Sequence, residues 1–450
     1  MRVSVIGTGY VGLVSGVCLA EMGHEVVCVD VDRAKVDQIN RGQSPIYEPG
    51  LEALLKKHSG KNVIADTDLQ AAVAGTDLSL ISVGTPYRGD KIDLTYIRQA
   101  AQEIGAALKS KDGYHVVVVK STVVPGTTDR VVLPILESAS GKKAGSGFGL
   151  GMNPEFLREG EAVSDFMAPD RIVMGVIDEK SLKALEALYS CFPAAEKIRT
   201  TTQTAEMIKY TANCLLATLI SFSNEIGNLC AAMTGGVDVV DVMKAVHLDK
   251  RISPFLPAGG RITPGIAQFI EAGCGFGGSC FPKDVRALIS FGEEKGQSMN
   301  LMKEVIRINE QQPDQILQLI EGVFPDPRNV RVGILGLAFK PGTDDIRESP
   351  ALPVVRKLLA KGAVVKAFDP VAAENARKFF NDERIEYCDS VQQAVAGTDV
   401  VVLMTRWDEF AGLPDLLKDI APQPIVIDGR RMLDKSRVNS YFGIGLGALQ

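Results

Sequence analysis

Residues 2–30, RVSVIGTGYVGLVSGVCLAEMGHEVVCVD, decide the fold of the amino-terminal part of this chain. A β-branched run, a glycine-rich turn, a helix-like stretch and a second apolar run together predict one βαβ unit. The turn carries Gly7, Gly9 and Gly12 in a Gly-x-Gly-x-x-Gly pattern, and Asp30 ends the second strand. Such glycines let a helix N-terminus approach a pyrophosphate, and an acid at this spacing accepts hydrogen bonds from ribose hydroxyls. The segment therefore predicts a dinucleotide site.

The charge of Asp30 favours NAD over NADP, because a carboxylate there repels a 2′-phosphate. Lys35 follows five residues later, and we expect it either to supplement the ribose contacts or to be solvated. The alternative for the whole motif is a tight turn that packs a helix on a strand without any ligand.

The rest of the chain extends this pattern into several domains. It has 450 residues, 46% of them hydrophobic, and a net charge of −6, which indicates two or three globular domains and argues against nucleic acid as a partner. Apolar runs at 77–85, 115–122 and 147–154 predict a parallel, doubly wound sheet. From about residue 203, apolar residues at helical spacing predict a helix of about 30 residues that bridges domains or packs on a partner chain.

A third region begins near Val330 and again alternates strands and helices. Residues 394–405, AVAGTDVVVLMT, echo residues 72–85, AVAGTDLSLISVGT, which indicates a duplicated α/β domain. The second copy lacks the third glycine of the first, so we expect only the first to hold a dinucleotide. The fold class is therefore α/β, with two Rossmann-like doubly wound sheets joined by a central long-helix domain.

Composition also limits the location and the metal chemistry. No apolar stretch is expected to reach transmembrane length, and the N-terminus lacks the basic segment of a signal peptide, so we expect a soluble, cytoplasmic protein without membrane partners. The cysteines form no CxxC pair and have no clustered histidines, so neither a disulfide framework nor a metal site is expected. Six of them are expected to be buried small hydrophobes: Cys18, Cys28, Cys191, Cys214, Cys230 and Cys388.

Cys280 is the exception among the cysteines. It lies in GCGFGGSCFPKDVRAL, residues 273–288, where glycines keep the backbone slim enough for a ligand to approach. Pro282 predicts a helix that begins just after Cys280, and the helix N-terminus together with Lys283 would stabilise a thiolate. The alternative is a buried structural cysteine before a helix. A thiol beside an NAD site is useful when an aldehyde must be oxidised further, through a thiohemiacetal and a thioester.

Other side chains suit the remaining roles. Glu155 and Glu159 in NPEFLREGEA are general-base candidates, although they could also be acids at a helix start. Lys209 and Asn213 are spaced i, i+4 and share a helix face, where they could hold an oxyanion; the alternative is a surface lysine. Thr122, at the end of a strand, could position a water.

Together these segments resemble the UDP-glucose/GDP-mannose dehydrogenase family, and within it the UDP-glucose 6-dehydrogenase branch. The resemblance covers essentially the whole chain. The motifs that carry it are GTGYVGL, PIYEPGL at 45–51, VGTP at 83–86, KSTVVPGT from 120, NPEFLREG, PDRIV at 169–173, AEMIKYTAN at 205–213, GFGGSCFPKD at 275–284, LAFKPGTDDIRESP at 337–350 and DGRR at 428–431.

The resemblance implies an NAD-binding domain at 1–200, a helical dimerisation domain at 201–300 and a UDP-sugar-binding domain at 301–450. It also implies a homodimer or higher homo-oligomer that oxidises C6 of UDP-glucose to UDP-glucuronate with two NAD per sugar. The alternatives are a GDP-mannose or UDP-N-acetylhexosamine dehydrogenase, a two-electron alcohol dehydrogenase, and a catalytically inactive NAD-binding scaffold.

The family's residue roles carry over by motif. Cys280 corresponds to the nucleophile, Lys209 and Asn213 to the oxyanion pair, Asp284 and Thr122 to the residues that hold a water for proton transfer, and Glu155 to the base of thioester hydrolysis. The implied NAD contacts are Gly7, Gly9, Tyr10, Val11, Gly12, Asp30, Lys35, Thr85, Thr122, Glu159 and Arg347. The implied substrate contacts are Glu155, Phe156, Leu157, Lys209, Asn213, Arg261, Phe276, Gly277, Lys340 and Arg430. Arg251 competes with Arg261 for the family's Arg-Ile position, and we favour Arg261 because it is nearer to Cys280 in sequence.

Overall fold

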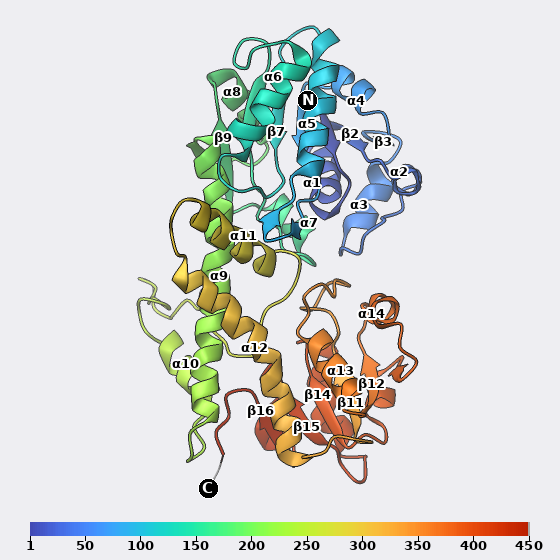
Figure 1. Cartoon of the computed structure of the whole chain (residues 1–450), viewed down its shortest axis with the longest axis vertical. Coiled ribbons are helices and arrows are strands. Elements are labelled where there is room, and N and C mark those ends of the chain that lie inside the picture. Colours follow the sequence, from blue (N-terminus) through green and yellow to red (C-terminus); the bar gives the residue numbers. More distant parts are fainter. Residues whose placement is uncertain (449–450) are drawn as a thin grey trace. The chain divides into compact units, whose positions relative to one another are not determined.

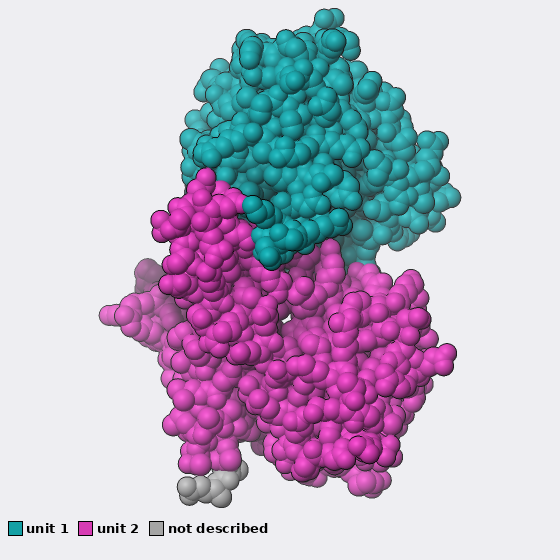
Figure 2. All heavy atoms as spheres, viewed as in Figure 1, with its two compact units in different colours: residues 1–212 teal, residues 213–450 magenta. Residues whose placement is uncertain are grey.

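The computed structural model describes residues 1–448 and divides the chain into two compact units. The first comprises Met1–Ala212 and the second Asn213–Gln450, coloured separately in Figure 2. Each unit contains one large sheet, and each is described by itself.

The first unit is built on an eight-stranded sheet in the order β10-β9-β8-β7-β4-β1-β2-β3. All neighbouring strands are parallel except β8 and β9. Because parallel strands need crossover helices, the sheet is covered on both faces. The strands are β1 (Arg2–Ile6), β2 (Glu25–Val29), β3 (Val63–Asp66), β4 (Leu78–Ile81), β7 (Val116–Val119), β8 (Gly149–Met152), β9 (Arg171–Val176) and β10 (Glu196–Thr200), with a separate hairpin of β5 (Tyr87–Arg88) and β6 (Lys91–Ile92).

Two apolar clusters mark the two faces of this sheet. Helices α1, α3, α7 and α8 contribute to one cluster, and α4, α5 and α6 to the other. Figure 1 shows α5 and α6 together on one side of the unit. The helices are α1 (Tyr10–Glu21), α2 (Arg33–Asn40), α3 (Leu51–His58), α4 (Leu69–Gly75), α5 (Thr95–Ser110), the π-helix η1 (Thr128–Val132), α6 (Leu133–Ser140), α7 (Ala162–Met167) and α8 (Glu179–Leu188).

The second unit carries a six-stranded parallel sheet in the order β13-β12-β11-β14-β15-β16. One face is covered by α12 and α13, and the other by α15 and α16. The strands are β11 (Arg331–Leu335), β12 (Val364–Phe368), β13 (Ile385–Tyr387), β14 (Val400–Leu403), β15 (Ile425–Asp428) and β16 (Tyr441–Gly443). The helices are α10 (Val239–His247), η2 (Gly265–Phe269), α11 (Phe281–Glu294), α12 (Asn300–Val323), α13 (Ala351–Ala360), α14 (Ala373–Phe380), α15 (Val391–Val395), η3 (Asp408–Gly412), α16 (Leu413–Leu417) and η4 (Lys435–Arg437).

The two sheets share one topology, which confirms the predicted α/β class and the predicted duplication. The run β3-β2-β1-β4-β7-β8 has the same order and direction as β13-β12-β11-β14-β15-β16. The echoed sequences form α4 and β4 in one unit and α15 and β14 in the other. Both strands lie beside the first strand of their sheet, at the topological switch point where open α/β sheets bind ligands.

Helix α9 (Thr202–Ala231) is the predicted long helix, with 30 residues. Two expectations need correction. Within residues 1–448, α9 is long and apolar enough to cross a membrane by length and composition, although no such segment was expected. Part of its apolar surface instead packs in the protein, including Ala205 and Tyr210. Cys191 is exposed rather than buried, because it lies in the turn after α8.

Candidate active site

The three glycines after β1 differ in what requires them. Gly7 has φ +96°, and its amide donates to Val29 O at 2.7 Å. A Cβ on Gly12 would lie 1.9 Å from Gly7 O, so this glycine allows α1 to approach the strand. A Cβ on Gly9 would meet nothing within 4 Å. Gly9 precedes the first turn of α1, so the open space lies at the helix N-terminus, where the dinucleotide motif places a pyrophosphate.

Asp30 is fixed beside this loop by protein hydrogen bonds. Its Oδ2 accepts from the Thr8 amide at 2.9 Å and the Thr8 hydroxyl at 2.6 Å, and its Oδ1 accepts from Asp32 N at 3.0 Å. Burial alone would raise the pKa of Asp30, but these bonds and the charge of Lys35 outweigh it, and the pKa is lowered. A carboxylate has about four lone-pair sites, so Asp30 retains a site for a ribose hydroxyl.

Further predicted NAD contacts gather around the same edge of the sheet. The Thr85 hydroxyl donates to Thr122 O at 2.9 Å, which joins the segments after the adjacent strands β4 and β7. Tyr10 begins α1 and donates its hydroxyl to Glu48, and the charge of Glu159 adds to the factors that raise the pKa of Tyr10. Burial is the largest of these factors, so the Tyr10 hydroxyl stays a protonated donor.

Glu155 and Lys209 form a buried ion pair in the first unit. Glu155 Oε1 lies 2.9 Å from Lys209 Nζ, and Oε2 accepts from Leu157 N at 2.6 Å. Phe156 lies beneath two cations, with its ring centroid 5.5 Å from Lys209 Nζ and 3.8 Å from the Arg171 guanidinium. The alternative of Lys209 as a surface lysine is therefore wrong, because its side chain is only 4% exposed.

Lys120 adds a second buried cation to this pair. Its Nζ donates to Asn153 Oδ1 at 2.9 Å, and burial lowers its pKa to about 8 while the charge of Glu155 opposes that shift. Lys209 lowers it further. Two lysines facing one glutamate make this cluster electrostatically suited to a developing negative charge.

In the second unit, Cys280 is the N-cap residue of α11, as predicted. Its carbonyl accepts from Asp284 N at 2.8 Å, the first bond of the helix, and its Sγ lies 3.7 Å from Ser279 Oγ. The Asp284 carboxylate is buried and accepts from Asn213 Nδ2 at 2.6 Å and Lys283 Nζ at 2.5 Å. Cys280, Asp284 and Asn213 therefore form a connected group of predicted residues.

The glycines before Cys280 pack against protein. A Cβ on Gly277 would lie 2.3 Å from Glu348 O, and a Cβ on Gly278 would lie 2.8 Å from the Phe339 ring. Glycines are required at these two positions because the segment after β11 packs directly on the backbone. This packing explains the glycines without the expected approach of a ligand. Phe276 is buried, and its ring packs edge-on against Phe281 with centroids 5.9 Å apart.

The remaining predicted residues are cations with partners nearby. Arg261 donates to the carbonyls of Leu248 and Ser253, and Arg251 pairs with Asp249. These pairs share one irregular segment, and which arginine reaches a neighbouring site stays a prediction. Arg347 pairs with Asp345 at 2.7 Å, and Lys340 Nζ lies 5.9 Å from the Phe339 centroid. Arg430 donates to the carbonyls of Met404 at 2.7 Å, Gly275 at 3.1 Å and Phe339 at 3.4 Å.

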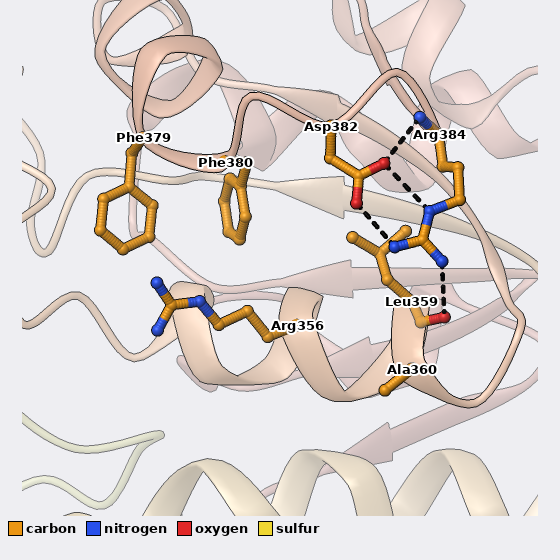
Figure 3. Close-up of a pocket in the computed structure, with 7 residues that line it drawn as sticks. All are labelled: Arg356, Leu359, Ala360, Phe379, Phe380, Asp382 and Arg384. Atoms are coloured by element: carbon orange, nitrogen blue, oxygen red, sulfur yellow. Dashed lines mark hydrogen bonds and ion pairs between the residues drawn. The ribbon is translucent and has the colours of Figure 1, made fainter.

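A hollow between α13 and α14 contains none of the predicted site residues (Figure 3). The Arg384 guanidinium there pairs with Asp382 and donates to Leu359 O. The lining residues are Arg356, Leu359, Ala360, Phe379, Phe380, Asp382 and Arg384. Among residues 1–448, no cluster of three or more His, Cys, Asp or Glu side chains is arranged to hold a metal ion.

Several residues at these sites were not predicted from the sequence. Lys120 opens KSTVVPGT, and a lysine that ends a buried strand is itself a signal of function. Glu48 lies in PIYEPGL and accepts from the amides of Gly160 and Ala162, both at 2.7 Å. Asn309 lies mid-helix in α12 and contacts the loop before Cys280, and no local sequence signal marks it.

A Rossmann sheet with an open helix N-terminus for a pyrophosphate and an acid for a ribose is typical of an NAD-dependent oxidoreductase. The comparisons with known proteins agree. The chain matches the UDP-glucose/GDP-mannose dehydrogenase family models for the NAD binding domain over residues 1–193, the central domain over 203–311 and the UDP binding domain over 333–435.

Relatives match over nearly the full length. A UDP-glucose 6-dehydrogenase of Haloferax volcanii is 42% identical over 98% of this chain and 99% of its own. A GDP-mannose 6-dehydrogenase of Pseudomonas putida is 41% identical over 92% and 93%. The solved UDP-glucose dehydrogenase of Pyrobaculum islandicum superposes with a TM-score of 0.89 at 41% identity, covering 99% of this chain and 97% of its own. The chain belongs to the UDP-glucose/GDP-mannose dehydrogenase family.

Proposed function

We propose that the chain oxidises C6 of UDP-glucose to a carboxylate, giving UDP-glucuronate, with Cys280 as the covalent nucleophile. The observation that carries the proposal is Cys280 at the N-terminus of α11, one turn before a buried Asp284 that Asn213 and Lys283 hold. A helix N-terminus favours a thiolate.

NAD, which the glycine loop after β1 and Asp30 would hold, would supply the hydride acceptor for each of two oxidation steps. In the first, C6–OH loses a proton and C6 loses a hydride, which leaves an aldehyde. The Cys280 thiolate then adds to that aldehyde, and loss of a second hydride from the thiohemiacetal gives a thioester. Water cleaves the thioester, releasing the carboxylate and restoring the thiol. The overall change is a four-electron oxidation that consumes two NAD and one water.

The other side chains supply charge and proton transfer. Lys209 and Asn213, one turn apart on α9, are suited to stabilise the oxyanion of the thiohemiacetal. Glu155 is suited to act as the base for the hydrolytic water, with Lys209 2.9 Å away to stabilise its charge. Asp284 and Thr122 are assigned to hold a water in proton transfer. The presence of the complete set Cys280, Lys209, Asn213, Asp284 and Glu155 favours an enzyme over an inactive scaffold.

Sequence identity does not decide the sugar nucleotide. The UDP-glucose and GDP-mannose relatives are 42% and 41% identical to this chain. The choice of UDP-glucose rests on the structural match to a UDP-glucose dehydrogenase and on two segments that resemble that branch, PDRIV at 169–173 and TRWDEF at 405–410.

The test is the stoichiometry of NADH formation with UDP-glucose, GDP-mannose and UDP-N-acetylhexosamines. We expect two NADH per UDP-glucose, and Cys280→Ser should keep NAD binding while net oxidation stops. Cys191→Ser, which changes an exposed thiol in the first unit, is the matched control and should retain activity. One NADH per sugar, or full turnover by the Cys280→Ser variant, would refute the thioester scheme. Turnover of another sugar nucleotide but not UDP-glucose would refute the substrate.

The chain is also proposed to form a homodimer through α9. Leu215, Phe222 and Leu229 are 52%, 48% and 61% exposed and recur every seven residues, so they lie on one face of the helix. An exposed apolar stripe of this length is typical of a helix that packs on a partner. Sedimentation equilibrium of the full chain tests this. The cytoplasmic location stays a prediction.

A further inference from the structure

The loop that leads to Cys280 is buried although it has no regular secondary structure. Residues 272–278 are all buried, and the loop ends at the N-terminus of α11. Buried peptide groups outside helices and sheets must find other hydrogen-bond partners, because leaving them unpaired costs about 1–3 kcal/mol each. The hydrogen-bond partners of this loop therefore determine where Cys280 lies.

Amide side chains on α12 and α9 supply these partners. Asn309 Oδ1 accepts from Phe276 N at 2.7 Å, and its Nδ2 donates to Phe276 O at 2.9 Å. Gln312 Nε2 donates to Gly273 O at 2.7 Å, and Asn224 Oδ1 accepts from Gly273 N at 2.8 Å. The backbone N–H and the backbone C=O of Gly273 and of Phe276 are thus all hydrogen-bonded to side chains rather than to other backbone groups.

Asn309 also lies close to the backbone between Gly273 and Phe276. Gly275 has φ +99°, and a Cβ on it would lie 2.9 Å from Asn309 Oδ1. Its carbonyl accepts from the Arg430 guanidinium at 3.1 Å. Gly275 therefore combines a left-handed backbone conformation with two close neighbours. The Asn309 amide leaves no room for a side chain at Gly275, and Arg430 holds its carbonyl.

The chemistry of the contact suits an amide. Phe276 presents one donor and one acceptor to a single side chain, and the planar amide of Asn309 offers an acceptor and a donor on separate atoms. A carboxylate at this position would keep the bond from Phe276 N but would face Phe276 O without a proton to donate. This pairing is specific, since a residue that merely filled space would not need both functions.

We infer that Asn309 is a positioning residue that fixes the loop 273–279 and thereby places the Cys280 thiol for attack. Asn309 does not touch the reacting atoms, and it acts through the backbone of Phe276, four residues before the thiol. The inference rests on the proposed role of Cys280. Because a displacement of about 1 Å in a nucleophile can cost on the order of 100-fold in rate, the loop's anchoring has a direct kinetic consequence.

The experiment compares Asn309→Ala with Asn300→Ala, an exposed asparagine at the start of the same helix. Alkylation of Cys280 by iodoacetamide is followed by mass spectrometry, with the exposed Cys191 of the same molecule as the internal reference. We expect Asn309→Ala to change the Cys280 to Cys191 rate ratio by about threefold or more and to lower kcat on the order of tenfold, with KM for NAD within about twofold. Asn300→Ala should change neither.

An unchanged alkylation ratio in a folded Asn309→Ala variant would overturn the inference, whatever happens to kcat. If that variant does not fold, the isosteric Asn309→Asp retains one of the two bonds and takes the same measurements, with the same deciding ratio. The outcome is separate from the proposed function. Should Cys280 not be the nucleophile, Cys280→Ser would keep turnover while the alkylation ratio still responded to Asn309→Ala.

Discussion

The buried carboxyl group of Glu206 is expected to make the stability of the protein depend on pH. Its carboxylate is fully buried on α9 and accepts three hydrogen bonds from the loop after Thr122: from Gly126 N at 2.5 Å, and from Thr128 N at 2.8 Å and Thr128 Oγ1 at 2.7 Å. Burial raises its pKa from 4.5 to about 7, because desolvation outweighs these bonds, and the charge of Asp129 adds to the shift.

The direction in which stability changes with pH follows from the linkage between proton binding and folding. A carboxyl group whose pKa is raised by folding binds its proton more tightly in the folded state. Its contribution to stability is therefore complete below about pH 4.5 and is lost as the pH rises through about 7. The full difference corresponds to about 3 kcal/mol, of which on the order of 1 kcal/mol falls between about pH 6 and about pH 8.

Urea unfolding of the full chain at several pH values measures this effect. Glu206→Gln removes the titration, so the free energy of unfolding of the variant relative to the natural protein should rise by on the order of 1 kcal/mol from about pH 6 to about pH 8. The constant cost of the altered hydrogen bonds cancels in that comparison. Glu225→Gln, an exposed position on the same helix, should show no such trend. A difference that stays constant with pH for Glu206→Gln would refute the assignment.

Two further predictions concern the cofactor and the assembly. Asp30→Ala should raise KM for NAD on the order of tenfold, because a charge-assisted hydrogen bond to a ribose is worth about 1.5–3 kcal/mol, while the exposed Asp37→Ala should not; an unchanged KM would remove Asp30 from the site. Phe222→Glu should shift the sedimentation of the chain towards monomer, because it places a charge in the apolar stripe on α9. Ile64→Glu, which is 52% exposed on β3, is the control, and the same assembly state in both variants would refute the α9 interface.

Periodic sequence patterns predicted many of the helices and strands, because the formation of these elements depends mainly on residues that are neighbours in the sequence. The βαβ unit, the long helix and the helix that begins after Cys280 were all visible as hydrophobic spacing, glycine or proline. The edge strand β10 (EKIRT) was not, because its residues are mostly exposed and polar and only its register with β9 makes it a strand. The π-helix η1 likewise has no sequence signal of its own.

Contacts between distant residues could not be predicted in the same way. Asn309 and Phe276 are 33 residues apart, and Glu206 and Gly126 are 80 apart. Nothing in their local sequences indicates that they meet. The glycines before Cys280 show the same limit, because their collisions would be with Phe339 and Glu348, which only the folded chain brings near. Residue type predicted the chemistry at Cys280, whereas tertiary packing determines what holds it in place.

The two sheets share the turn after their first strand but differ in how the acid after their second strand is bonded. Gly336 repeats the turn of Gly7, with φ +99° against +96° and an amide bond to Phe368 O of 2.8 Å against 2.7 Å to Val29 O. The acids that end the second strands differ in their bonding. The first unit's acid, Asp30, accepts three protein bonds and remains partly exposed.

Asp369, the counterpart of Asp30, is 3% exposed and accepts from five donors: the amides of Leu337, Ala338, Val371 and Ala372, and Trp407 Nε1. Five donors exceed the roughly four lone-pair sites of a carboxylate, so no acceptor is left for a ribose hydroxyl. The second copy has therefore turned its ribose acid into an internal anchor for the turn after β11. That turn continues into the segment of Phe339 and Glu348 that packs on Gly277 and Gly278, so the same acid also steadies the loop before Cys280.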